Sequence, residues 1–181
     1  MLSEVQQRKL TRLFNLLDTD HDGVINQADY QARIDRLSAT SGQISGSAGH
    51  EALERGHMND WQRTRSFADA NRDQQVVLPE FLAANESLLS DREEFAAHGG
   101  TLVAITVGLV DSNGDGHIGA EEFRRSLEGY GLSAEAAQAA FARLDRSGDG
   151  QLSRDELAQA IEEFFFSADP EAPGNWLLGM F

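Results

Sequence analysis

The chain has 181 residues, which is enough for one globular domain or for two small lobes that share a core. Thirty acidic residues against fifteen basic ones give a net charge of −15, so we expect no nucleic acid and no anionic membrane surface as a partner. The chain has no cysteine, which excludes disulfides, thiolate zinc sites and catalysis by a thiol.

The N-terminal stretch has no apolar run of the kind found in signal peptides. The longest apolar run in the chain, at 101–110, is about half as long as a membrane span requires. We therefore expect a soluble, cytoplasmic protein.

The first recognisable element is a twelve-residue stretch at 18–29, DTDHDGVINQAD. Oxygen-bearing side chains occupy its positions 1, 3, 5 and 12, namely Asp18, Asp20, Asp22 and Asp29. Calcium takes roughly six to eight oxygen ligands, and a tightly coiled loop turns these side chains and the position-7 carbonyl of Val24 toward one point. Gly23 at position 6 allows the positive φ that the turn needs. Because Asp29 is shorter than glutamate, this calcium loop is also expected to tolerate Mg²⁺ best.

The same spacing returns at 69–80, after a Ser/Gly-rich loop at 38–49. The candidate ligands are Asp69, Asn71, Asp73, the carbonyl of Gln75, and Glu80. Position 6 is Gln74 instead of glycine, and a non-glycine residue in the left-handed region costs about 1–2 kcal/mol. We expect this loop to be the weakest of the four and leave its occupancy open.

The third and fourth copies, at 111–122 and 145–156, have glycine at position 6 and glutamate at position 12. The candidate ligands are Asp111, Asn113, Asp115, the carbonyl of His117, and Glu122 in the third loop, and Asp145, Ser147, Asp149, the carbonyl of Gln151, and Glu156 in the fourth. Glutamate is long enough for bidentate coordination, and the loops start 34 residues apart, as in a standard pair. We expect a cooperative, calcium-selective pair, in which Ser153 and Glu156 also cap the exiting helix.

Position 8 is apolar in all four copies, which predicts a short strand that pairs with the neighbouring loop; these residues are Ile25, Val76, Ile118 and Leu152. Apolar residues precede and follow the loops at helical spacing, for example Phe14 and Leu17 before the first loop. Each loop therefore lies between two amphipathic helices, which is the arrangement of an EF-hand. Plain Asp/Gly turns are the alternative, but four copies with matching spacing argue against them.

The predicted fold is all-α, with four EF-hands in two pairs that form a compact globule with short β pairing between the loops. We expect an N-terminal pair at 1–92, a C-terminal pair at 93–166, and a C-terminal tail at 167–181 that packs on the fold. Trp176, Leu177 and Leu178 are the expected anchors of the tail, because its apolar content favours burial over fraying.

The chain length, the uneven loop spacing and the tail resemble the sarcoplasmic calcium-binding proteins and bacterial relatives such as calerythrin. Luciferin-binding proteins and calcium-activated photoproteins belong to the same wider group. The resemblance implies a compact molecule rather than a dumbbell. Relatives of this type commonly have one silent hand, often the second, and this agrees with the weakness expected for the loop at 69–80.

Three uses of calcium are compatible with this sequence. Calcium sensors expose a methionine-rich groove, but this chain has only three scattered methionines, so a monomeric calcium buffer or store is expected. A sensor that regulates an unidentified protein partner is the alternative. A luciferin-binding protein is a more distant one, because two tryptophans and two tyrosines are few for such a cavity. The five histidines are expected to be solvated, and no catalytic arrangement indicates an enzyme.

Overall fold

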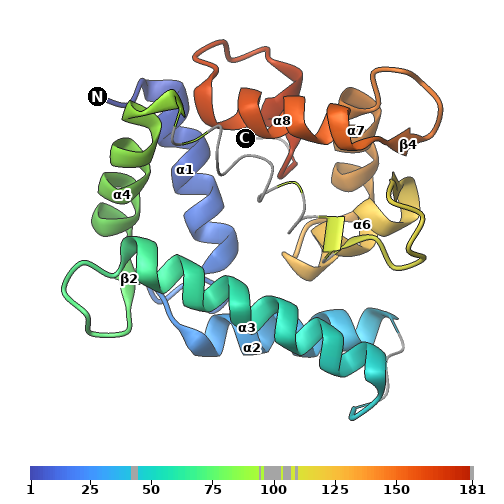
Figure 1. The fold of residues 1–181 in the computed structure, drawn as a ribbon, viewed down its shortest axis with the longest axis horizontal. Helices are drawn as coiled ribbons and strands as arrows, with labels where there is room; N and C mark the ends of the chain where they lie inside the picture. The colour runs from blue at the N-terminus through green and yellow to red at the C-terminus, as the bar shows by residue number, and fades with distance from the viewer. Residues whose placement is uncertain (42–44, 94, 96–102, 104–106, 109, 180–181) are drawn as a thin grey trace.

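The computed structural model describes the whole chain except residues 42–44, 94, 96–102, 104–106, 109 and 180–181 (Figure 1). The helices of the described part confirm the all-α prediction. They are α1 (Glu4–Leu17), α2 (Gln27–Ser41), α3 (Ala48–Ala68), α4 (Leu78–Ser90), α6 (Ala120–Gly129), α7 (Ala134–Leu144), α8 (Arg154–Phe166) and the short 3₁₀ helix η1 (Pro173–Trp176). In this part of the chain, each helix is too short or too polar to cross a membrane. Most of the apolar run at 101–110 lies outside the described residues.

Two small antiparallel sheets join the loops in pairs, as the apolar residues at position 8 predict. Strand β1 (Val24–Ile25) pairs with β2 (Val76–Val77), so that Ile25 lies opposite Val76. Strand β3 (Ile118–Gly119) pairs with β4 (Gln151–Leu152), so that Ile118 lies opposite Leu152. All four position-8 side chains are at most 1% exposed. Each sheet therefore fixes two loops back to back over a buried apolar contact.

Each pair of hands has its own apolar core, and corresponding positions meet in both. Phe14 and Phe81 meet edge to face in the N-terminal core, with ring centroids 5.8 Å apart. Phe123 and Phe141 make the same kind of contact at 5.8 Å in the C-terminal core. In both cases one ring comes from four residues before a loop and the other from the residue directly after its partner loop. The repeated sequence pattern therefore produces a repeated packing contact.

The two pairs are in direct contact, so the molecule is compact rather than a dumbbell. Helix α2 packs on α6, and Gly129 approaches Leu37 so closely that a Cβ at 129 would lie 2.4 Å from its Cδ2. Helix α1 also contacts α8. In Figure 1, α2 and α3 run side by side along one edge of the molecule, with α7 and α8 along the opposite edge. The boundary proposed between 92 and 93 stays a prediction.

The tail packs on the fold, but its buried anchor differs from the expected one. Helix η1 contacts α7 and α8, and Asn175 is completely buried. Trp176, Leu177 and Leu178, which the sequence singles out, are only partly buried. The amide of Asn175 donates to the carbonyls of Asp169 and Pro170, both at 2.9 Å, which closes the tail on itself. A polar residue therefore organises this segment, while Met180 and Phe181 lie outside the described residues.

Lys9, the only lysine in the chain, attaches the tail to α1. Its side chain is 0% exposed, and Nζ donates to Glu163 O at 2.9 Å, Ser167 O at 2.8 Å and Asn175 Oδ1 at 3.0 Å. Arg12 adds a second attachment, because its guanidinium donates to the carbonyl of Leu178 at 2.9–3.0 Å. The first helix and the last segment of the chain thus hold each other.

Burial of Lys9 predicts a measurable pH effect. Desolvation lowers the pKa of Lys9 from 10.5 to about 8, although the charge of Glu163 acts in the opposite direction. Between these two pH values the unfolded chain holds a proton that the folded chain has released, so this residue's contribution to stability increases as the pH rises. In protein labelled with ¹³C-lysine, the single Cε resonance is expected to titrate near pH 8. A midpoint near the ordinary lysine pKa would contradict this prediction.

The expectation of solvated histidines is wrong for His57. Its side chain is 3% exposed on α3, and both ring nitrogens are buried without a hydrogen-bond partner in the described structure. Burial, reinforced by the charge of Arg33, lowers the pKa of His57 to about 3, so the ring is neutral at pH 7. The guanidinium of Arg33 is itself buried between the rings of Tyr30 and Tyr130, at 4.3 and 4.8 Å. His57, Arg33 and the two tyrosines thus form a largely buried polar and aromatic cluster that the sequence does not predict.

Candidate metal centres

The first loop brings three carboxylates together. Oxygens of Asp18, Asp20 and Asp22 all lie within 4.8 Å of one another. Oδ2 of Asp18 accepts the N–H of Gly23 at 3.0 Å, whereas Oδ1 of Asp18 is buried without a hydrogen-bond partner in the described structure. A buried anionic oxygen without a donor is costly, and a hard cation is the partner that carboxylates of this kind prefer. The donor set therefore fits Ca²⁺ or Mg²⁺.

Asp29 closes this loop at position 12. Its carboxylate is 2% exposed and bridges the two ends of the loop, accepting from Thr19 N at 2.7 Å and from Asn26 N at 2.8 Å. Burial raises the pKa of Asp29 despite these N–H groups, and the nearby charge of Asp20 adds to the effect. A bound cation would favour the ionised form. The shorter aspartate thus still bridges the start and the end of the loop.

The third loop has the same closure with glutamate. Oε1 of Glu122 accepts from Ser112 N at 2.8 Å and Asn113 N at 3.2 Å, and Oε2 accepts from Gly119 N at 3.0 Å. Although burial opposes it, these bonds lower the pKa of Glu122. The carboxylate is therefore held ionised and oriented at the mouth of the loop.

The fourth loop repeats the arrangement and adds a helix cap. Oε1 of Glu156 accepts from Arg146 N at 3.1 Å and Ser147 N at 3.0 Å, while Oε2 accepts from Ser153 N at 2.9 Å. Ser153 Oγ in turn accepts from Glu156 N at 3.2 Å, which confirms the predicted capping pair. Hydrogen bonds from Ser153 and Ser147 outweigh burial and lower the pKa of Glu156 to about 2.

The second loop coils like the others but does not close in the same way. Asp73 N donates to Asn71 Oδ1 at 2.9 Å, and Gln74 N donates to Asp69 Oδ2 at 3.0 Å, so positions 1, 3 and 5 converge. Glu80, however, accepts only from Val77 N, at 3.2 Å, and among the described residues it has no bond to the start of the loop. The bridge made by Asp29, Glu122 and Glu156 is missing here. This difference supports the low rank that the sequence predicts for this loop.

A second left-handed residue in each loop escaped the sequence analysis. Position 6 has positive φ throughout, as expected, but position 4 does too; the residues at position 4 are His21 (φ 60°), Arg72 (63°), Gly114 (77°) and Gly148 (73°). The glycines at position 4 of the third and fourth loops could have indicated this second left-handed position. In the second loop neither Arg72 nor Gln74 (φ 67°) is glycine, so this loop carries the strain of two positions.

Relief of this strain is expected to strengthen the second site. Gln74→Gly removes about 1–2 kcal/mol of left-handed strain, which corresponds to a roughly five- to thirty-fold gain in calcium affinity at this loop. Arg72→Gly is expected to have an effect of similar size. Calorimetric titration measures both, with Gln75→Gly as the matched control, because residue 75 has no positive φ. An equal gain from Gln75→Gly would contradict the explanation.

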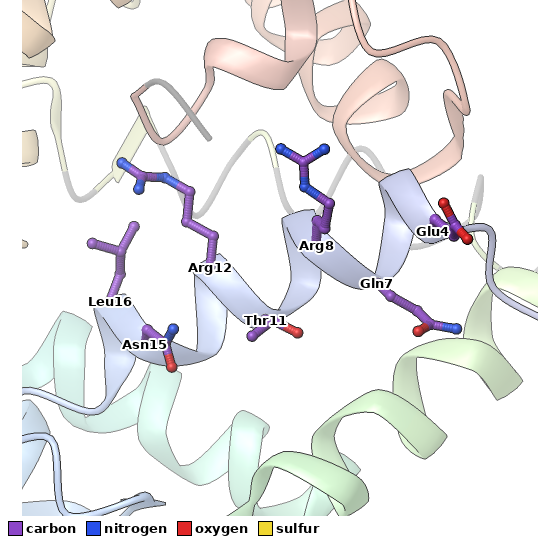
Figure 2. Close-up of a pocket in the computed structure, with 7 residues that line it drawn as sticks. All are labelled: Glu4, Gln7, Arg8, Thr11, Arg12, Asn15 and Leu16. Carbon is purple, nitrogen blue, oxygen red and sulfur yellow. The ribbon is translucent and has the colours of Figure 1, made fainter.

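A hollow of about 620 Å³ along α1 lies apart from the loops (Figure 2). Figure 2 shows Arg8 and Arg12 projecting from the same side of α1, while Thr11 and Asn15 project from another. With two arginines and one carboxylate, Glu4, among its lining residues, this hollow is unsuited to a cation. Arg12, one of the lining residues, donates a hydrogen bond to the carbonyl of Leu178 and so helps to attach the tail.

Family models match segments of the chain that contain the first, third and fourth loops. A family model described as an EF-hand domain pair matches residues 109–162, and a second model with the same description matches 3–33. Calerythrin of Saccharopolyspora erythraea is 28% identical over 147 residues, which cover 80% of this chain and 83% of that protein. Sarcoplasmic calcium-binding proteins II, V, VI and VII of Branchiostoma lanceolatum are 24% identical over 144 residues, or 77% of this chain and 78% of theirs.

Solved structures share the fold over most of the chain. A calcium-binding protein of Streptomyces coelicolor, described in terms of prokaryotic calcium-mediated regulation, has a TM-score of 0.71 at 27% identity and covers 88% of this chain and 97% of its own. The coelenterazine-binding protein of Renilla muelleri, in a calcium-loaded apo form, has a TM-score of 0.81 at 22% identity. It covers 99% of this chain and 100% of its own, and at this identity the likeness concerns the fold alone.

Proposed function

Since the chain is an EF-hand calcium-binding protein of the type of calerythrin and the sarcoplasmic calcium-binding proteins, we propose that it serves as a calcium buffer or store. Calcium would be held at three loops, 18–29, 111–122 and 145–156, with the fourth loop, 69–80, as a weaker site. The unpartnered buried oxygen of Asp18, beside Asp20 and Asp22, is the observation that carries the proposal. A bound Ca²⁺ supplies the positive charge that these carboxylates lack.

The surface of the described residues supports a buffer over a sensor. The large apolar side chains exposed there are Met1, Phe67 and Val77, which do not make up a methionine-rich groove. Regulation of a protein partner stays the alternative, and the similar Streptomyces coelicolor protein is associated with prokaryotic calcium-mediated regulation. The chain offers carboxylates for binding rather than for acid–base chemistry, so we propose a binding protein and not an enzyme.

Calorimetric titration with calcium, alone and under millimolar magnesium, tests the proposal. A buffer is expected to show three strong sites with dissociation constants of about 10⁻⁹–10⁻⁸ M, whereas about 10⁻⁷–10⁻⁵ M indicates a sensor. Magnesium is expected to compete best at the first loop, where position 12 is the shorter Asp29. Asp29→Glu should reduce that competition. Fewer than three strong sites would contradict the proposal.

We further propose a monomeric, cytoplasmic protein built from the three units 1–92, 93–166 and 167–181. The net charge of −15 supports this, since it opposes self-association and repels nucleic acid and anionic membranes. Sedimentation in the calcium-bound state tests the oligomeric part; a dimer at micromolar concentration would overturn it.

Binding of a small apolar molecule is a second candidate function, favoured by one cavity. It measures about 390 Å³ and is lined by residues that include Leu37, Leu53, His57, Phe123 and Tyr130. This volume lies within the range of small-molecule sites, and the neutral ring of His57 has both a donor and an acceptor without a partner. A titration with coelenterazine tests it: a saturable absorption shift that His57→Phe removes would support this function, and no shift would exclude it.

A further inference from the structure

Glu163 in α8 contacts three separate parts of the molecule. Its two carboxylate oxygens accept from Nη2 of Arg146, the second residue of the fourth loop, at 2.7 Å each. Oε2 also accepts the N–H of Gly174 in the tail at 2.8 Å. The backbone carbonyl of Glu163 accepts from Nζ of Lys9 in α1 at 2.9 Å. One residue therefore joins the fourth loop, the tail and the first helix.

Arg146 is connected to the candidate metal site through its backbone. Its N–H donates to Oε1 of Glu156 at 3.1 Å, the same oxygen that accepts from Ser147 N. Its guanidinium is a positive charge beside a loop that would hold a cation, so it weakens cation binding unless it is compensated. Glu163 supplies the compensating charge. The two side chains are 31% and 23% exposed, so solvent screens the pair only in part.

The tail fixes the side chain of Glu163 by a close approach. A Cβ at Gly174 would lie 2.4 Å from Glu163 Cβ and 2.5 Å from Ala160 O, so only glycine fits there. The next residue, Asn175, is 0% exposed and accepts from Lys9 Nζ. A docked tail therefore restricts Glu163, and a restricted Glu163 keeps both carboxylate oxygens on Nη2 of Arg146.

We propose that Glu163 couples cation binding at the fourth loop to docking of the tail, so that each event stabilises the other. The coupling is reciprocal, because a tail that strengthens calcium binding must itself be strengthened by calcium to the same extent. Arg146 and Glu163 act here as positioning residues and not as ligands. The inference rests on the proposed calcium site at 145–156.

A calcium titration followed by NMR tests the effect on the metal site. The amide of Gly150, which donates to Asp145 Oδ2 at 2.9 Å, reports this loop alone. Glu163→Gln is expected to weaken calcium binding there by roughly two- to five-fold, as suits a partly exposed pair. Glu162→Gln is the matched control, because it removes the same charge one residue away, where Glu162 pairs with Arg92 instead. Equal affinities in the two variants would overturn the proposal.

Hydrogen exchange of the tail tests the reverse direction without relying on affinity. Calcium is expected to increase the protection of the amides at 173–178, and Glu163→Gln to reduce that increase. Gly174→Ala should weaken binding at Gly150 as Glu163→Gln does, whereas Gly108→Ala, whose Cβ would meet nothing within 4 Å, should not. Tail protection that is the same with and without calcium would overturn the coupling. A Gly150 resonance that calcium does not move in the unmodified protein would instead overturn the calcium site, and the coupling with it.

Discussion

Lys9→Met is expected to lower the free energy of unfolding of the calcium-bound protein by about 3–4 kcal/mol. Among the described residues, the substitution leaves Ser167 O and Asn175 Oδ1 without their donor, whereas Glu163 O loses Lys9 but keeps the N–H of Ser167. A buried acceptor without a partner costs about 1–3 kcal/mol. Removal of a desolvated ammonium offsets part of this cost, although the contact of Nζ with the ring of Phe164, 5.6 Å from its centroid, is lost as well.

Urea denaturation in saturating calcium measures this loss, with Arg8→Met as the control. Arg8 lies next to Lys9 on α1 and is exposed, so the control removes one positive charge from the same helix at a position where water can reach the groups around it. We expect its effect to stay within about 0.5 kcal/mol. A double-mutant cycle with Asn175→Leu should be non-additive, because the two side chains share one hydrogen bond. Equal losses for Lys9→Met and Arg8→Met would refute the role given to Lys9.

The helices, the pairing of loops and the two cores could be predicted because each depends on a local and repeated pattern. Position 8 is apolar in every copy because its side chain is buried against the position-8 side chain of the partner loop, as Ile25 is opposite Val76. The positive φ at position 6 of the second loop could also be predicted, although Gln74 stands there instead of glycine. The sequence could not show that Glu80 fails to bridge its loop, because that bridge depends on how the exiting helix is placed.

The features that escaped prediction depend on contacts between residues that are distant in the chain. Lys9 meets Asn175 across 166 positions, and no periodicity in either segment announces the contact. His57 lies on a helix whose polar residues look solvated, yet it is 3% exposed, and this burial together with the charge of Arg33 keeps its ring neutral. One signal in the sequence did point to Lys9. It is the only lysine among fifteen basic residues, so the surface charge of the chain does not depend on lysine, and a specific role for this one could be suspected.

Removal of calcium with EDTA is expected to lower the melting temperature by at least about 20 °C and to leave the protein expanded. Each filled site adds about 4 kcal/mol when free calcium is a thousand times its dissociation constant, so three sites together add about 12 kcal/mol. This equals the whole stability of an ordinary domain, about 5–15 kcal/mol. Each kcal/mol corresponds to a shift of about 2–4 °C for a chain of this size.

Charge repulsion inside the loops is the physical reason for this loss. Thirteen carboxylates occupy positions 1, 3, 5 and 12 of the four loops, and those of Asp18, Asp20 and Asp22 approach within 4.8 Å of one another. When calcium is removed with EGTA instead of EDTA, added magnesium should recover part of the lost melting temperature. High sodium chloride should recover a smaller part, because it only screens the repulsion. Identical melting curves in EDTA and in calcium would show that the loops fold without their cations. The N–H donors of the loops would then have to stabilise these carboxylates alone, in the way that hydrogen bonds from Ser153 and Ser147 lower the pKa of Glu156 against the effect of burial.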